Sequence, residues 1–218
     1  MISRAAARGP FCSMYKLAPV GLLVALLAAS FGQDPASNGA EFTTAIEKAQ
    51  RAFARDERGA TVAALRHAIL VVQQRQRAAV LAILPTPAGF THEDVAPATA
   101  AKDPFAVEIA ALGLDVERRY RGTEDARFDI EVSTDSPLVQ AFARLLEDPD
   151  RVVGSGGRIV KYGDHSALVK FKDGHGEVTV VLRDRHVVKV TADAMTEAAV
   201  NAIVDREVVD RIDRELAR

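Results

Sequence analysis

The chain of 218 residues has little sulfur, few aromatic side chains and almost no net charge. It contains no tryptophan, 6% aromatic residues and a formal charge of −2. This near-zero charge gives no electrostatic reason to expect binding to nucleic acid. No apolar run reaches the roughly 20 residues of a membrane-spanning helix. The 48% apolar content indicates an ordinary globular protein rather than a disordered or polytopic membrane chain.

Residues 1–32 have the pattern of a secretory signal peptide, with basic residues before a short apolar run over 17–29 and small residues after it. The small residues place the expected cleavage between Gly32 and Gln33. The single cysteine, Cys12, lies before the cleavage position. The processed chain therefore has no disulfide, no thiolate metal site and no cysteine nucleophile, which suits an oxidising compartment.

Three alternatives for this N-terminal region stay open. Cleavage before Phe31 uses a second register of small residues, and translation from Met14 still leaves a basic start before the apolar run. An uncleaved segment would instead anchor the protein to a membrane. If residues 1–32 are removed, the chain carries 25 Lys or Arg against 30 Asp or Glu. We expect a periplasmic or secreted, mildly acidic protein.

The remaining chain divides into four segments by its pattern of apolar and turn-forming residues. The segments are a flexible leader over 33–40, a helical hairpin over 41–84, a connector over 85–106 and an α+β domain over 107–218. Apolar residues in the hairpin recur with the helical period, and a tight turn around Gly59 separates its two helices. Pro85 ends the second helix.

The second helix of the hairpin has an apolar stripe that is interrupted in its middle. The stripe consists of Val62, Leu65, Ile69, Val72, Ala79 and Ile83. The interruption is the polar stretch Gln73–Arg77. It is either a bend that faces water or the polar rim of a groove for a partner. The hairpin itself either packs on the rest of the protein or forms an interaction surface.

After the connector, apolar and polar residues alternate with the period of a β-strand. The expected strands cover 112–120, 127–133, 158–162, 165–171, 177–182 and 187–192. The short connections between the last four strands allow only hairpins. These features predict an α+β fold, with the N-terminal antiparallel hairpin followed by an antiparallel sheet of about six strands packed with two helices.

Two helices are expected within and after the sheet. Asp135-Ser136 is expected to cap a helix that begins at Pro137 and stops at Pro149. Asp193 is expected to cap a closing helix over 194–217. The spacing on the outer face of that closing helix predicts the ion pairs Glu207–Arg211 and Asp210–Arg214.

The residues that could bind a ligand lie at one end of the meander that the last four strands form. Successive turns of a meander alternate between the two ends of a sheet, so two of its turns share one end. Asp164, His165, Asp184 and His186 follow or lie in those turns. They are a candidate mixed nitrogen and oxygen metal site. The alternative is that they are ordinary polar residues of exposed turns. We identify no catalytic residue and no cofactor site.

The order of elements resembles a known family. Leu84-Pro85 before Gly89-Phe90, two strands, a Ser-Pro helix, a hairpin meander and a closing helix are similar to Mog1/PsbP-type α/β/α sandwich proteins. The resemblance covers residues 84–218 and extends to small exported bacterial proteins. It implies a binding or assembly factor rather than an enzyme.

These observations favour a non-enzymatic accessory protein that binds another envelope protein. The alternative is a binder of a metal or small ligand at the turn end, and a hydrolase is the least supported class. An exposed apolar patch on the hairpin would favour the first interpretation.

Overall fold

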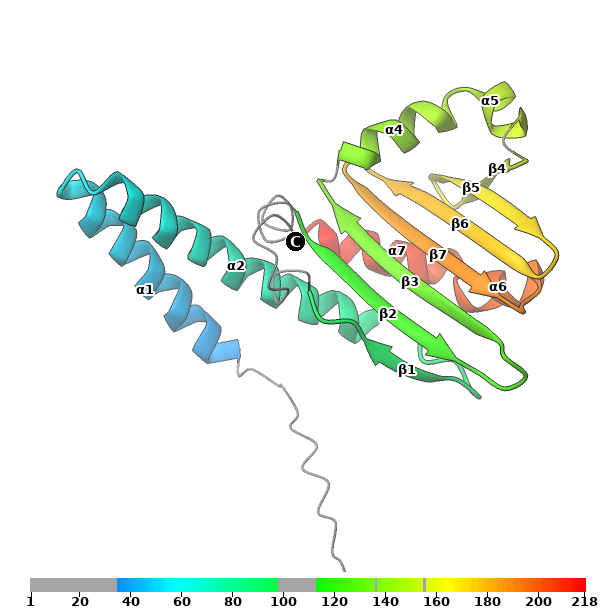
Figure 1. Ribbon diagram of the computed structural model, residues 1–218, viewed down its shortest axis with the longest axis horizontal. Coiled ribbons are helices and arrows are strands. Elements are labelled where there is room, and N and C mark those ends of the chain that lie inside the picture. Colours follow the sequence, from blue (N-terminus) through cyan, green and yellow to red (C-terminus); the bar gives the residue numbers. More distant parts are fainter. Residues whose placement is uncertain (1–34, 98–112, 136, 155) are drawn as a thin grey trace, which may run out of the picture. The chain divides into compact units, whose positions relative to one another are not determined.

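The computed structural model of the chain describes residues 35–97, 113–135, 137–154 and 156–218. These residues belong to one compact unit that spans 33–218. A helical pair precedes an antiparallel sheet and further helices (Figure 1), which confirms the predicted α+β class. The expected signal peptide and its cleavage position between Gly32 and Gln33 lie outside the described residues.

The helical pair consists of α1 (Pro35–Ala54) and α2 (Arg58–Ile83). In the connection between them, Asp56 adopts a positive φ of 58°. The structure differs from the predicted flexible leader over 33–40, because α1 already begins at Pro35. Proline suits the first position of a helix, where its missing amide hydrogen is not needed.

The sheet has seven strands rather than the expected six, and every neighbouring pair is antiparallel. Its strands are β1 (Thr91–Asp94), β2 (Asp115–Arg121), β3 (Arg127–Thr134), β4 (Arg158–Tyr162), β5 (His165–Lys172), β6 (His175–Leu182) and β7 (His186–Asp193). Their spatial order is β1-β2-β3-β7-β6-β5-β4, so β1 and β4 are the edges. The last four strands form the predicted meander.

The additional strand, β1, lies inside the segment 85–106 that was expected to be a connector. It pairs with β2, and Thr91 is opposite Arg121 in the register. All four of its residues are polar and exposed. A strand of this composition has no apolar alternation, which is why the sequence pattern does not reveal it.

The strand β3 illustrates how the sheet forms its core. Phe128, Ile130 and Val132 are buried, whereas Asp129 between the first two is half-buried and Glu131 between the last two is exposed. This alternation confirms the predicted strand with one face toward water.

The principal core lies between the sheet and the helices α6 (Glu197–Ile203), α7 (Arg206–Leu216) and the C-terminal part of α2. Figure 1 shows α6 and α7 behind the sheet. Val80 and Leu84 belong to this core together with Ile212. The second half of the hairpin therefore packs on the domain and is not an independent unit.

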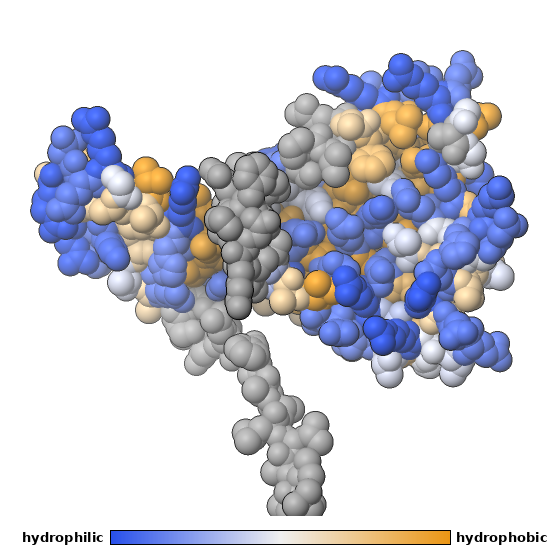
Figure 2. All heavy atoms as spheres, viewed as in Figure 1, coloured by the Kyte–Doolittle hydropathy of each residue, from blue (hydrophilic) through white to orange (hydrophobic). Residues whose placement is uncertain are grey.

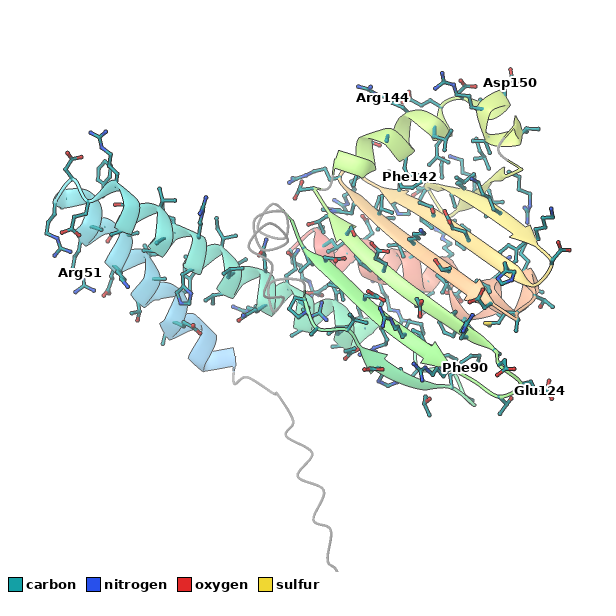
Figure 3. All side chains as sticks on the ribbon, viewed as in Figure 1. Arg51, Phe90, Glu124, Phe142, Arg144 and Asp150 are labelled. Carbon is teal, nitrogen blue, oxygen red and sulfur yellow. The ribbon has the colours of Figure 1, made fainter. Side chains whose placement is uncertain are left out.

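A smaller core lies on the opposite face of the sheet, under α4 (Pro137–Leu146), the helix that precedes α5 (Pro149–Gly154). Phe142, labelled in Figure 3, packs there against the cluster of Val139, Val181 and Val187. Pro149 does more than stop a helix, because it is the first residue of α5.

The closing helix expected over 194–217 is in fact two helices, separated at Val204 and Asp205. The Asp205 side chain accepts a hydrogen bond from the main-chain amide of Val208 and so caps α7. The Thr196 side chain caps α6 in the same way. Such a cap allows a new helix to begin within the segment. The capping side chain accepts a hydrogen bond from a main-chain amide that would pair with a carbonyl one turn earlier in a continuous helix.

The two aspartates expected to be caps form ion pairs instead. Asp193 accepts hydrogen bonds from Arg127, at 2.6 Å, and from His175. Asp135, which has a positive φ of 52°, accepts two hydrogen bonds from Arg185. Both carboxylates therefore connect strand ends and turns, whereas Ser136, the other residue of the expected cap before Pro137, lies outside the described residues.

Among the described helices, none combines the length and the apolar character that would be needed to cross a membrane.

Candidate interaction surface on the helical pair

The two helices of the pair contact each other through small side chains. The buried residues on their facing sides are Ala45, Ala49 and Ala52 on α1, and Ala64, Ala68 and Val71 on α2. Alanine has no side chain beyond its β-carbon, so the two helix axes can approach closely.

Most of the large exposed apolar side chains of the described chain lie on this pair of helices. Phe42, Phe53, Val62, Leu65, Ile69 and Val72 are between 39% and 74% exposed, and we call them the apolar face. The one other such residue is Val153, on α5. Figure 2 shows apolar side chains gathered along the helical pair.

Helix geometry places these six residues on one side of the pair. An α-helix turns by about 100° per residue. Measured about each helix axis from the buried alanines, the six residues lie at rotations of roughly 50–150°, in the same direction along the chain on both helices. Seen from one end of the pair, successive residues run clockwise around one helix and anticlockwise around its antiparallel partner. Equal rotations from the two buried sides therefore place both sets of apolar side chains on the same side of the pair, where they form a continuous surface.

The area of the apolar face is at the upper end of the range found on monomeric proteins. If a fully exposed large apolar side chain presents roughly 160–220 Å², the six residues leave on the order of 600 Å² uncovered. The largest apolar patch on a typical monomer measures about 300–600 Å² and is often functional. A standard protein interface buries about 800 Å² on each partner. The uncovered apolar area is thus smaller than, but comparable with, the area that one partner contributes to such an interface.

One line of residues along α2 is exposed at one end and buried at the other. Ile69 is 49% exposed, whereas Val80 is fully buried in the principal core. Val80 follows Ile69 by eleven residues, or about three turns along nearly the same line of the helix. The sequence predicts a single apolar stripe, and the fold covers only its C-terminal part.

The polar stretch Gln73–Arg77 marks the place where α2 meets the sheet. The side-chain amide of Gln73 donates a hydrogen bond to the carbonyl of Gly113 at 3.1 Å. Arg77 donates to the carbonyls of Asp115, at 2.8 Å, and of Val95. Burial lowers the pKa of the Arg77 guanidinium below its ordinary value. Gln73 and Arg77 thus bind main-chain carbonyls at the boundary between the exposed and buried parts of the helix.

The charge around the apolar face is mainly positive. The helix α2 has no acidic residue, and its charged or titratable side chains are Arg58, Arg66, His67, Arg75 and Arg77. Between residues 41 and 83 the chain has seven Lys or Arg and four Asp or Glu. Arg51, labelled in Figure 3, lies near the connection between the helices. The helical pair is therefore basic although the chain as a whole is slightly acidic.

The turn-end residues are only partly brought together. Asp164, His165 and Asp184 line a groove of about 250 Å³ beside α4. His186 does not line this groove, and it is only 8% exposed. Within the described part of the chain, no group of three or more His, Cys, Asp or Glu side chains has the arrangement of a metal site. The geometry therefore gives no support to metal binding by these four residues.

A neighbouring ion pair was not recognised from the sequence. Arg183 donates two hydrogen bonds to the carboxylate of Asp213, at 2.7 and 2.8 Å, and these bonds lower the pKa of Asp213. Burial lowers the pKa of His186, whose Nδ1 has no hydrogen-bond partner among the residues that the structure describes. Asp213 directly follows the inward-facing Ile212 on α7, which is the signal that could have placed it beside the core.

Comparison with known proteins adds no family assignment. Neither protein families, nor curated proteins, nor solved structures gave a significant match to this chain. The resemblance to Mog1/PsbP-type proteins stays a prediction.

Proposed function

We propose that this chain is an exported, non-enzymatic binding protein of the bacterial envelope, and that it binds a partner protein through the apolar face of α1 and α2. The observation that carries the proposal is the exposure of Phe42, Phe53, Val62, Leu65, Ile69 and Val72 on one side of the helical pair. A patch at the upper end of the range found on monomers is often functional.

The chemistry of the surface favours a particular kind of partner. Two helices with an apolar side provide a long shallow surface that suits the apolar side of a third helix. Because α2 has no acidic residue, acidic flanks on that third helix would meet complementary charge. We therefore assign the face to an amphipathic helix of another envelope protein, with acidic residues beside its apolar stripe.

Export supports this assignment and has its own test. The basic start, the short apolar run and the small residues before Gln33 support secretion of the processed chain. Expression of the full-length gene in a bacterial host should place the protein in the periplasmic fraction, with a mass that corresponds to residues 33–218. If the protein is recovered in the membrane fraction with residues 1–32 still attached, cleavage is contradicted and the uncleaved membrane anchor is favoured.

Binding can be measured by tryptophan fluorescence, because the natural chain contains no tryptophan. A Phe53→Trp variant places the only indole on the apolar face. Two designed peptides serve as probes, with the same leucine stripe but either glutamate or lysine at every polar position. We expect saturable binding of the glutamate peptide and at least tenfold weaker binding of the lysine peptide.

Substitutions on the face provide the matched control. In the Phe53→Trp background, Leu65→Asp with Ile69→Asp should abolish binding of the glutamate peptide. Val153→Asp should leave it unchanged, because Val153 is 69% exposed on α5 and lies outside the helical pair. Equal binding of both peptides, or binding that survives the double substitution, would overturn the assignment.

Two other occupants of the face would give different results. Sedimentation velocity of the unlabelled protein detects a second copy as a concentration-dependent dimer that the double substitution abolishes. If the face bound a membrane surface, vesicles that contain anionic lipid would shift the emission of the Phe53→Trp variant without any peptide. Either result, without binding of the glutamate peptide, would contradict the proposed partner.

A further inference from the structure

A second surface lies away from the apolar face, where the C-terminal end of α2 approaches α6 and α7. Residues 82–87, Ala202, Ile203 and Arg211 line a groove of about 510 Å³ there. This volume is within the range of about 300–1,000 Å³ that is typical of small-molecule sites. The lining is apolar except for Thr86 and Arg211, and no acidic side chain contributes to it.

Arg211 is the unusual member of this lining. The sequence predicts an ion pair with Glu207, one turn earlier on α7, but the structure forms no such pair. Among the described residues Arg211 has no hydrogen-bond or ion-pair partner, and its Nε is buried without one. A buried donor that lacks an acceptor is unfavourable, so a cation in this position needs an explanation.

The other polar groups of the groove do not supply an acceptor. The carbonyl of Pro85 already accepts a hydrogen bond from the hydroxyl of Tyr120, at 2.9 Å. The nearest acidic residue of α7 by sequence, Asp210, accepts from Arg206 instead, at 3.3 Å. The apolar walls are formed by Ile83 and Ile203, which pack against the principal core.

We propose that this groove binds a small amphiphile with an apolar body that ends in a single carboxylate. The carboxylate would accept hydrogen bonds from Arg211, and a planar guanidinium matches a carboxylate through two parallel bonds. The apolar body would lie along Ile83 and Ile203, where contact with the walls removes apolar surface from water. This site is separate from the apolar face and does not depend on the proposed function.

The charge requirement can be tested on the natural protein with three ligands that share one tail. Isothermal titration calorimetry would compare decanoate, decanol and decylammonium, each below its aggregation concentration. We expect saturable one-to-one binding of decanoate, at least tenfold weaker binding of decanol, and no binding of decylammonium. Decanol that binds as tightly as decanoate would overturn the role of Arg211.

Two variants localise the site. Arg211→Met retains the apolar length of the side chain and should weaken decanoate binding at least tenfold. Arg214→Met, an exposed arginine on the same helix, should leave the affinity unchanged. Ala202→Trp should block the groove, and the fluorescence of its indole should report whether the groove is occupied. This variant replaces Arg211→Met in the test if Arg211→Met does not fold. Binding that survives both groove substitutions would place the ligand elsewhere and contradict the proposal.

Two sources of such a carboxylate can be separated in the same assay. A fatty acid is represented by decanoate, and the C-terminus of a peptide by a short apolar peptide with a free carboxylate. The amidated form of that peptide lacks the charge and should not bind. Binding of the free peptide without binding of decanoate would assign the groove to peptide C-termini, and binding of neither would overturn the site.

Discussion

The guanidinium of Arg77 on α2 donates a hydrogen bond to the main-chain carbonyl of Asp115 on β2, with an N–O distance of 2.8 Å. A second bond from the same group reaches the carbonyl of Val95, so one side chain holds the helix, the start of β2 and the residue after β1 together. This contact connects the helical pair to the sheet.

Replacement of Arg77 by methionine should loosen that connection. We expect the free energy of unfolding to fall by about 1–3 kcal/mol, because two hydrogen bonds from a charged donor are lost and a partly buried carbonyl is left without its partner. Hydrogen exchange should accelerate in β1 and in the C-terminal half of α2. The matched control is Arg75→Met, an exposed arginine on the same helix. Equal destabilisation by both substitutions would contradict the assigned contact.

The close approach of α1 and α2 predicts a strong size limit at their contact. Ala49 is 4% exposed between the helices. An Ala49→Leu substitution should reduce stability by about 1–3 kcal/mol, because extra methyl groups must push the helices apart. Ala63→Leu, on the exposed side of α2, should change stability by less than about 0.5 kcal/mol. Chemical denaturation of the two variants would measure the difference, and a tolerated leucine at 49 would show that the helices are not closely packed.

Two glycines should respond to alanine in opposite directions. A β-carbon at Gly113 would lie 2.0 Å from the main-chain oxygen of Thr134, which cannot move without disrupting β3. We expect Gly113→Ala to destabilise the fold by more than about 2 kcal/mol. At Gly59, on the first turn of α2, no described atom outside the surrounding helix backbone lies within 4 Å of the position that a β-carbon would take, so Gly59→Ala should raise stability by about 0.5 kcal/mol. Thermal unfolding of both variants tests the pair.

The buried histidine predicts a loss of stability in mild acid. Burial lowers the pKa of His186 in the folded protein. In the unfolded chain the same imidazole binds a proton with its ordinary pKa of about 6.5, so protonation favours the unfolded state. The charged groups around it are Asp135, Arg185, Asp213 and Arg183. Stability should therefore decrease as the pH falls below about 6.5. His186→Gln should flatten this dependence between pH 5.5 and 7.5, and an unchanged slope would contradict it.

The ion pair of Asp213 with Arg183 acts in a separate, lower pH range. Its hydrogen bonds lower the pKa of Asp213, so their contribution is complete above the unfolded value of about 3.9 and is lost as the pH falls through the folded value. Asp213→Asn should cost about 1–2 kcal/mol at pH 7, the lower part of the range for a charged hydrogen bond, because Arg183 is half exposed. The difference between variant and natural protein should shrink below pH 4.

The sequence predicts the elements whose pattern is local. Alternation in β3 and the helical period of α2 correctly indicate a strand and a helix, and the short turns correctly indicate a meander. The strand β1 has no pattern of its own and exists only because β2 offers it an edge. The break at Asp205 is likewise missed, since an apolar stripe continues past it and only the cap reveals the new helix.

The candidate surfaces depend on tertiary packing and could not be predicted to the same extent. Periodicity identifies the apolar residues of α2 but cannot show that Ile69 is exposed while Val80 is buried. Charge spacing predicts a pair between Glu207 and Arg211, yet the approach of Ile83 and Ile203 gives Arg211 a different environment. In both cases the missing information is which other element covers the residue.

The two edges of the sheet have a consequence for self-assembly. At one margin β1 has four residues, all polar and exposed, and at the other β4 carries the charged Arg158 and Lys161 on exposed positions. Short and charged margins discourage another chain from adding a strand, which is the first step of fibril growth. The described edges of this seven-stranded sheet therefore offer a poor template for the addition of a strand from another chain.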